Sequence, residues 1–168
     1  MNEPAVETPW DSARYLREIL RAPVYEASEH TPLQVMATLS ARVGNTVEVK
    51  REDLQAVHSF KIRGAYNAMR SLTDAQRARG VVTASAGNHA QGVARSASVL
   101  GVRATIVMPT VTPSIKIDAV RSLGGEVLLR GENFDAAKAE AQRLSEVESL
   151  TFIAPFDDPR VIAGQGTI

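Results

Sequence analysis

An amine that could act as a nucleophile lies within residues 59–65, whose sequence is Ser-Phe-Lys-Ile-Arg-Gly-Ala. Lys61 can attack a carbonyl only when its amine is partly deprotonated, which requires removal from water or a neighbouring positive charge. Phe60 could exclude water from this amine, and Arg63 could supply the charge. Because lysine side chains are mostly exposed, a solvated lysine at the start of a helix is the alternative interpretation.

A site for an anion is predicted at residues 85–92, which follow an apolar run at residues 81–84. Small residues in this segment allow backbone N–H groups to point outward at the start of the next helix, where they can bind a carboxylate or a phosphate. In open parallel sheets, ligands bind beyond the carboxyl ends of the strands, and this loop is expected there. The glycine spacing matches neither the dinucleotide fingerprint nor the P-loop, so a tight turn without a ligand remains open.

The histidines and aspartates form no further catalytic or metal-binding pattern. His89 is a candidate acid or base, because imidazole titrates near neutral pH. Neither it nor His30 and His58 has a partner at metal-ligand spacing, so we expect structural or surface histidines and no metal site. The aspartates form no catalytic pair, and residues 156–167 indicate a turn at Asp157-Asp158-Pro159 followed by a glycine-rich approach to a helix.

The elements that must position these residues belong to an α/β fold. From about residue 80 onward, short apolar runs alternate with helical segments, which is typical of that class. The predicted strands are residues 81–84, 104–108, 126–129 and 151–153. Because each connection between them contains a helix, the strands should form a parallel sheet.

Capping residues mark the ends of the predicted helices. Thr73 to Gln76 has the spacing of a capping box, and Thr112-Pro113 places a cap residue ahead of a proline at the first helical position. Gly101 and Gly124-Gly125 are expected to end helices in the left-handed conformation. Asn133 should cap a helix through Glu148, whose apolar face is predicted from Ala137, Ala141, Leu144 and Val147.

The two ends of the chain have a different pattern. We predict a short helix at Tyr15–Leu20, a turn at Thr31-Pro32-Leu33 that enters a helix through Leu39, and a strand at Thr46–Lys50. The end of the chain, Val161–Ile168, stops on an apolar residue without a closing helix. We interpret this as truncation, with Gly164 and Gly166 at the start of another loop or helix.

Composition favours a small-molecule partner. Lysine plus arginine and aspartate plus glutamate each number 19, so no net charge attracts the chain to nucleic acid or a membrane surface. The absence of cysteine excludes disulfides, thiolate nucleophiles and cysteine-bound metals. The stretch Met1–Trp10 lacks the features of a secretory signal, and no run approaches the roughly 18 apolar residues of a membrane span, so we expect a cytoplasmic protein.

Taken together, these segments resemble the threonine dehydratases, which are fold-type-II pyridoxal-phosphate enzymes (tryptophan synthase β-like) related to serine racemase and cysteine synthase. The resemblance covers nearly the whole chain, in order, and residues 15–27 are most similar to the biosynthetic type. The segments that carry it are residues 15–17, 31–33, 49–55, 57–65, 84–94, 106–109, 124–127 and 156–167.

The resemblance implies a role for each candidate residue. Lys61 would bind pyridoxal 5'-phosphate covalently and later move the α proton of the substrate, with Phe60 beside the pyridine ring. Asn88 would donate a hydrogen bond to the phenolic oxygen of the cofactor. The substrate carboxylate would be received by Ser85, Ala86, Gly87, Asn88 and His89. The implied reaction converts L-threonine, and also L-serine, by dehydration and deamination; threonine yields 2-oxobutanoate and ammonia at the first step of isoleucine biosynthesis.

The resemblance also implies a division into lobes. Residues 1–60 would begin the larger cofactor-binding lobe, residues 61–150 would form a smaller α/β lobe, and residues 151–168 would return to the larger lobe. The family's glycine-rich phosphate loop, its partner for the pyridine nitrogen and its isoleucine-sensing domain would follow Ile168. We therefore expect this chain alone to bind the cofactor weakly and to be poorly active, and the full-length protein to be a tetramer. Ala56 replaces a proline that is usual in the family.

Four alternatives remain open. Serine racemase and serine dehydratase use the same lysine and a similar asparagine loop. Cysteine synthases tend to have aspartate after the lysine and threonine in the loop, whereas this chain has Ile62 and His89. An inactive fragment that only binds a small molecule is the alternative outside the enzymes.

Overall fold

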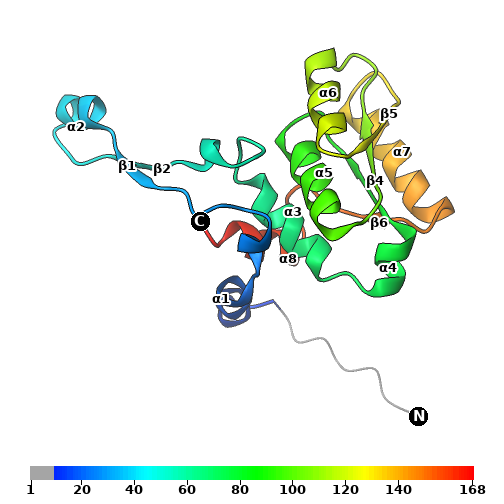
Figure 1. Ribbon diagram of the computed structural model, residues 1–168, viewed down its shortest axis with the longest axis horizontal. Helices are drawn as coiled ribbons and strands as arrows, with labels where there is room; N and C mark the ends of the chain where they lie inside the picture. The colour runs from blue at the N-terminus through cyan, green and yellow to red at the C-terminus, as the bar shows by residue number, and fades with distance from the viewer. Residues whose placement is uncertain (1–9) are drawn as a thin grey trace, which may run out of the picture.

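Helices and strands alternate along most of the chain in the computed structural model, which describes residues 10–168 (Figure 1). The helices are α1 (Ser12–Arg21), α2 (Ala37–Val43), α3 (Lys61–Arg70), α4 (Asp74–Arg79), α5 (Asn88–Leu100), α6 (Ser114–Ser122), α7 (Phe134–Val147) and α8 (Pro159–Gln165), with the 3-10 turns η1 (Val24–Glu26) and η2 (Glu52–Leu54). The strands are β1 (Leu33–Val35), β2 (Glu48–Lys50), β3 (Val81–Ala84), β4 (Ala104–Met108), β5 (Glu126–Leu129) and β6 (Thr151–Phe152). None of these helices is long and apolar enough to cross a membrane.

Four strands form one parallel sheet in the order β5-β4-β3-β6. The predicted bounds of β3, β4 and β5 are confirmed, and β6 is one residue shorter than predicted. All four residues of β3 are buried, because the strand is central in a sheet that is covered on both faces. Since the strands are parallel, their carboxyl ends lie at one edge of the sheet, and the loop after β3 begins there.

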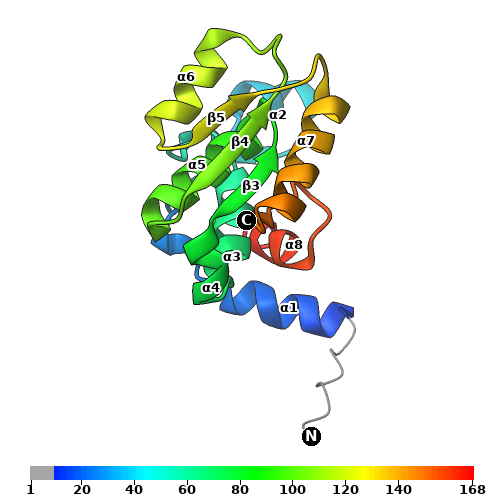
Figure 2. The same cartoon turned by 90° about the vertical axis from the view of Figure 1, so that its right-hand side faces the viewer.

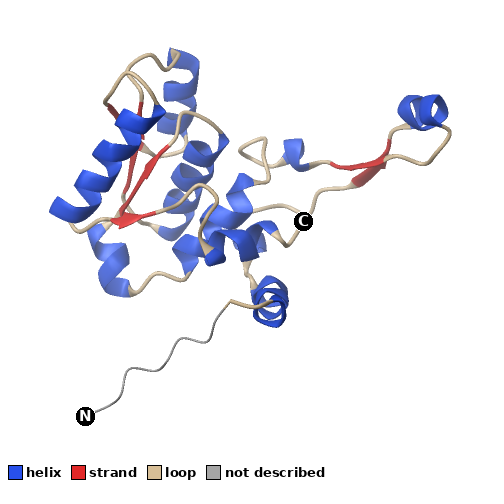
Figure 3. Cartoon of the chain, turned by 180° about the vertical axis from the view of Figure 1, so that it is seen from behind, coloured by secondary structure: helices blue, strands red, loops and turns tan. Residues whose placement is uncertain are grey.

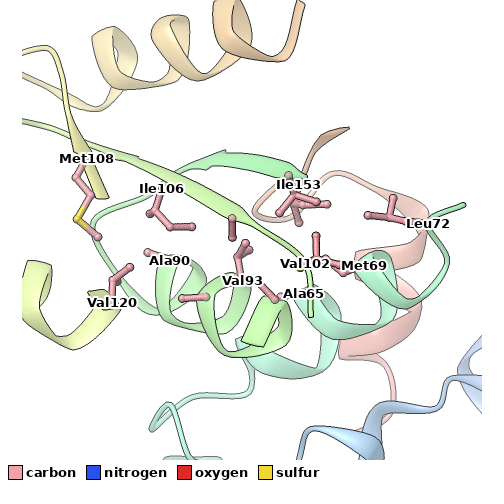
Figure 4. Close-up of a cluster of buried hydrophobic side chains, with 14 of the residues drawn as sticks. Ala65, Met69, Leu72, Ala90, Val93, Val102, Ile106, Met108, Val120 and Ile153 are labelled. Atoms are coloured by element: carbon pink, nitrogen blue, oxygen red, sulfur yellow. The ribbon is translucent and has the colours of Figure 1, made fainter. Parts of the chain in front are cut away.

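Helices cover both faces of this sheet, with α5 and α6 on one side and α7 on the other (Figure 2). On the first side, Ala65 and Met69 of α3 share a buried cluster with Ala90 and Val93 of α5 (Figure 4). Alanine at these contacts allows the helices to approach closely. The β5-β4-β3-β6 sheet therefore forms the middle layer of the α/β fold that the sequence predicted.

The opposite face is covered by α7, through Ala137, Ala141 and Leu144. These three residues were predicted for the apolar face of this helix. The prediction for Val147 is wrong, because its side chain is 69% exposed. Val147 is the last residue of α7 and extends past the sheet that buries the other three.

Most helix boundaries follow the predicted caps. The capping box at Thr73–Gln76 is present, Asn133 accepts a hydrogen bond from the Ala136 N–H, and Gly101 ends α5 with φ of 65°. The prediction for Thr112 is wrong. Its N–H donates to the carbonyl of Pro109 in the preceding turn, so Pro113 occupies the N-cap and α6 begins one residue later.

An arm made of β1, α2 and β2 leads away from the sheet (Figure 3). The prediction that a turn at Thr31-Pro32-Leu33 enters a helix is wrong, because residues 33–35 form a strand that pairs antiparallel with β2. Leu33 pairs with Lys50, and this long-range pairing overrides the local helical pattern. α2 begins only at Ala37.

The last helix was also missed in part. Gly164 was predicted at the start of a loop or helix, but it lies inside α8, which Asp158 caps by accepting a hydrogen bond from the Arg160 N–H. α8 packs closely against α3. A Cβ at Gly164 would lie 2.5 Å from the Arg63 carbonyl oxygen, so only glycine allows the backbones of the two helices to meet.

Candidate functional site

Lys61 is the first residue of α3, and its side chain is partly buried. The Nζ atom donates a hydrogen bond of 2.8 Å to the carbonyl oxygen of Pro155, in the segment between β6 and α8. The fold thus brings together an amine and a carbonyl that are 94 positions apart in the sequence. The hydrogen bond holds the amine near the carboxyl edge of the sheet, where ligands of parallel sheets bind.

Two aromatic rings lie beside this amine. The ring centroid of Phe60 is 5.7 Å from Nζ, and that of Phe156 is 5.5 Å away, both within reach of a cation–π contact. Phe60 was a predicted site residue. Phe156 was missed, and the available signal was an aromatic residue in the segment that follows β6. Both rings are partly open to solvent, so a planar ligand has access to them.

Burial lowers the pKa of the Lys61 amine below its usual value. The prediction that Arg63 supplies a neighbouring positive charge is wrong. The Arg63 guanidinium is fully buried and paired with the Glu52 carboxylate, at 2.7 Å for Nε–Oε2 and 2.8 Å for Nη2–Oε1. Desolvation, and not charge repulsion, is therefore what increases the uncharged fraction of Lys61.

The ion pair of Arg63 and Glu52 anchors the first turn of α3 to the segments before it. Glu52 also accepts a hydrogen bond of 2.5 Å from the Thr31 hydroxyl and a longer one from Gln55. Burial alone would raise the pKa of Glu52, but the bonds from Arg63 and Thr31 hold that pKa below its usual value. The carboxylate therefore stays charged and satisfied within this network.

The loop predicted to bind an anion connects β3 to α5. Ser85, Ala86 and Gly87 are partly exposed, and Asn88 is exposed at the first position of α5. No side chain in the described part of the chain accepts a hydrogen bond at the N-cap of this helix, so the N–H groups of its first turn have no side-chain cap. A Cβ at Gly87 would meet no atom within 4 Å, which leaves space for a ligand over the backbone. The helix dipole adds to the attraction for an anion.

His89 is buried, and its Nε2 atom lies 3.2 Å from the Ile153 carbonyl oxygen. A carbonyl only accepts, so Nε2 carries the hydrogen. Burial lowers the pKa of His89 to about 4, although the bond to Ile153 opposes that shift. The ring is therefore neutral near pH 7, in line with the structural role that we expected for it. Its part in binding a substrate carboxylate stays a prediction.

Residues 153–155 accept hydrogen bonds from both Lys61 and His89. Lys61 bonds to Pro155, His89 bonds to Ile153, and the Thr83 hydroxyl donates to the Ile153 carbonyl at 2.8 Å. The backbone of Lys61 also contacts α5 at Gly92, where a Cβ would lie 3.1 Å from the Lys61 oxygen. The lysine and the helix that follows the loop are thus direct neighbours.

A cavity of about 280 Å³ lies between α7 and residues 152–157. Its lining includes Phe134, Phe152 and Phe156, so Phe156 contributes both to this cavity and to the surroundings of Lys61. Among residues 10–168, no group of three or more histidine, cysteine, aspartate or glutamate side chains could hold a metal ion.

Chemically, this arrangement fits ligands that together provide a carbonyl group, a flat ring and an anionic group. The Lys61 amine can attack the carbonyl once it has lost its proton. The two phenylalanine rings can contact the flat ring, and the first turn of α5 can bind the anion. Pyridoxal phosphate has the carbonyl group and the flat ring, and the carboxylate of an amino acid is a suitable anion for the first turn of α5.

Comparisons with known proteins agree with this chemistry. A family model described as "Pyridoxal-phosphate dependent enzyme" matches residues 24–168. The biosynthetic L-threonine dehydratase of Escherichia coli (strain K12) is 63% identical over 158 residues, which are 94% of this chain and 31% of that protein. The chain therefore spans about a third of the length of this curated relative.

Solved structures of similar fold are also related in sequence. The processed form of threonine deaminase isoform 2 from Solanum lycopersicum superposes with a TM-score of 0.91 at 53% identity, covering 99% of this chain and 50% of that one. Serine racemase from Dictyostelium discoideum gives a TM-score of 0.83 at 36% identity, covering 90% and 50%. The fold type that the sequence predicted is confirmed by these likenesses.

Proposed function

The chain belongs to the pyridoxal-phosphate dependent enzymes, and on this premise we propose that the protein dehydrates and deaminates L-threonine to 2-oxobutanoate and ammonia. This reaction is the first step of isoleucine biosynthesis. The 63% identity to a biosynthetic L-threonine dehydratase supports the assignment. Because the chain spans only 31% of that relative, the activity is proposed for the whole protein.

The observation that carries the proposal is the environment of the Lys61 amine. It is partly buried, its pKa is lowered by desolvation, and its neighbours are two aromatic rings and the carbonyl of Pro155. An amine with these properties is suited to capture the aldehyde of pyridoxal 5'-phosphate. We assign cofactor binding to Phe60, Lys61 and Asn88.

The substrate carboxylate is assigned to the loop at Ser85, Ala86, Gly87, Asn88 and His89. Its backbone N–H groups and the start of α5 attract a negative charge without a cationic side chain. His89, neutral and fixed to Ile153, holds the first turn of α5 in place.

Lys61 acts as the base that removes the α proton. When bound, pyridoxal phosphate supplies an electron sink that stabilises the charge left on the α carbon. The lowered pKa of Lys61 suits this task, because a base with a pKa closer to neutrality is uncharged in a larger fraction of molecules. The rings of Phe60 and Phe156 lie 5.7 Å and 5.5 Å from this amine.

Further proposals concern the second substrate, the location, the oligomeric state and the lobes of the whole protein. L-Serine is a second substrate, because it has the same carboxylate, α proton and β hydroxyl. We also propose that the protein is cytoplasmic, that the full-length form is a tetramer, and that residues 1–60, 61–150 and 151–168 belong to alternating lobes. Neither nucleic acid nor a membrane is expected as a partner.

Parallel assays of L-threonine, L-serine and O-acetyl-L-serine with added cofactor test the proposed reaction. We expect 2-oxobutanoate and ammonia from threonine at the highest rate, and no product above background from the variant Lys61→Ala. Because the chain spans a third of its curated relative, the assay must detect slow turnover.

The other outcomes each identify a different function. A higher rate with L-serine, giving pyruvate or D-serine, would identify a serine dehydratase or a serine racemase. Sulfide-dependent consumption of O-acetyl-L-serine would identify a cysteine synthase. Equal, background rates from the full-length protein and its Lys61→Ala variant would point to a binding module without catalysis.

A further inference from the structure

Gly92 lies on α5 where that helix meets the backbone of Lys61. A Cβ at this position would be 3.1 Å from the Lys61 carbonyl oxygen, 3.2 Å from its carbonyl carbon and 3.3 Å from the Ile62 nitrogen. These separations are shorter than ordinary van der Waals contacts, so one of the two helices would have to move by a few tenths of an ångström. A residue without a Cβ thus occupies the point where α5 contacts the backbone of Lys61.

α3 is not free to retreat from such a contact. Its other side packs on α8, where a Cβ at Gly164 would lie 2.5 Å from the Arg63 oxygen, 2.7 Å from Gly64 Cα and 2.8 Å from Asn67 Cβ. The Arg63 guanidinium is also fixed to Glu52 by two hydrogen bonds. A methyl group at position 92 would therefore displace Lys61, the first residue of α3.

We propose that Gly92 is a positioning residue for the amine of Lys61. It contacts neither substrate nor cofactor; it sets how closely α3 approaches α5, and so where the lysine side chain begins. The proposal rests on the function proposed above, in which Lys61 captures the cofactor. It assigns a role to the last glycine of the segment 85–92, which the anion-binding function of that loop does not require.

The pKa of the Lys61 amine reports its position, because that pKa depends on how deeply the amine is buried. Nζ is 2.8 Å from the Pro155 oxygen, and the rings of Phe60 and Phe156 lie on other sides. His89 of α5 is a titratable group that interacts electrostatically with Lys61. The positive charge of Arg63 is paired with the Glu52 carboxylate. A displaced amine loses part of this burial, so its pKa returns toward the ordinary value.

The test compares Gly92→Ala with the wild-type chain by two measurements. Competitive labelling with isotopic acetic anhydride over a pH series, followed by peptide mapping, gives the pKa of the Lys61 amine without any cofactor. Borohydride trapping in the presence of pyridoxal 5'-phosphate gives the rate of cofactor capture. We expect a higher pKa for Lys61 and about tenfold slower capture at pH 7.5, since a 1 Å misplacement can cost about 100-fold.

Gly80→Ala is the matched control. Gly80 precedes β3 at the other end of the sheet, has φ of +100°, and would place a Cβ 2.9 Å from the Arg103 oxygen. It should lower the melting temperature and leave both the pKa and the capture rate of Lys61 unchanged.

A Gly92→Ala chain with an unchanged Lys61 pKa and capture rate would overturn the proposal, and so would one that does not fold. The second result would show that Gly92 serves packing in general. Failure of the wild-type chain to trap cofactor at Lys61 would instead count against the proposed function.

Discussion

Partial burial of the Lys61 side chain lowers the pKa of its amine below the usual value. Its Nζ contacts a backbone carbonyl and two aromatic rings, and within residues 10–168 desolvation is the cause of the lowered pKa. Arg63 is only two positions away in the sequence, but on a helix that spacing places it on a different face. There it pairs with Glu52, and the charge of the pair is internally balanced.

His89 gives a pH dependence of stability that can be measured. Its pKa is about 4 in the folded chain, below the ordinary histidine value of about 6.5, because burial disfavours the charged ring. Between these values the unfolded chain binds a proton that the folded chain does not, so protons stabilise the unfolded state. The free energy of unfolding should fall by about 3 kcal/mol as the pH falls from 6.5 to 4.

Urea denaturation at several pH values between 4.5 and 7 measures this dependence. The variant His89→Gln should have a flatter profile over the same range. Parallel profiles for the two chains would show that the histidine does not cause the loss of stability at low pH.

At the scale of elements, α3 is held by close contacts with α5 and α8. The contact with α8 depends on Gly164, where a Cβ would lie 2.5 Å from the Arg63 oxygen and 2.7 Å from Gly64 Cα. Backbone atoms cannot rotate away as a flexible side chain can. The position of α3 is therefore determined by Gly92 of α5 and Gly164 of α8.

Gly164→Ala should destabilise the chain by about 2 kcal/mol, because the added methyl group forces α3 and α8 apart. Chemical denaturation measures the effect. Gly87→Ala is a suitable control, since a Cβ there would meet nothing within 4 Å. Equal stabilities of the two variants would contradict the close packing of α3 on α8.

Elements with strong local signals were predictable from the sequence, and elements formed by distant pairing were not. The strands 81–84 and 104–108 and the Asn133 cap follow from apolar runs and a capping side chain. β1 was predicted as a turn entering a helix because its partner β2 is distant in the sequence. The partner of Arg63 and the approach of Phe156 to Lys61 were missed for the same reason: both depend on tertiary contacts.

At the scale of the whole molecule, the arm of β1, α2 and β2 is the part with least burial. Its exposed apolar side chains are Leu33, Val35, Met36, Leu39, Val43 and Val49. A short sheet with two edges and an apolar surface is prone to pair with another chain. The β5-β4-β3-β6 sheet, in contrast, is covered by helices on both faces.

We expect the 168-residue chain to self-associate through this arm. Size-exclusion chromatography with light scattering should give a mass that rises with concentration, and the double variant Val35→Lys, Val49→Lys should remain closer to a monomer. Val111→Lys is the control, because Val111 is 73% exposed but lies outside the arm. A monomeric wild-type chain at all concentrations would contradict the expectation.

Borohydride reduction tests directly whether Lys61 is the amine that binds the cofactor. The chain has four lysines, at positions 50, 61, 116 and 138. After incubation with pyridoxal 5'-phosphate, reduction and peptide mapping, we expect the label on Lys61 in clear excess over the other three lysines. A label spread evenly over the four lysines, or missing from Lys61, would contradict it.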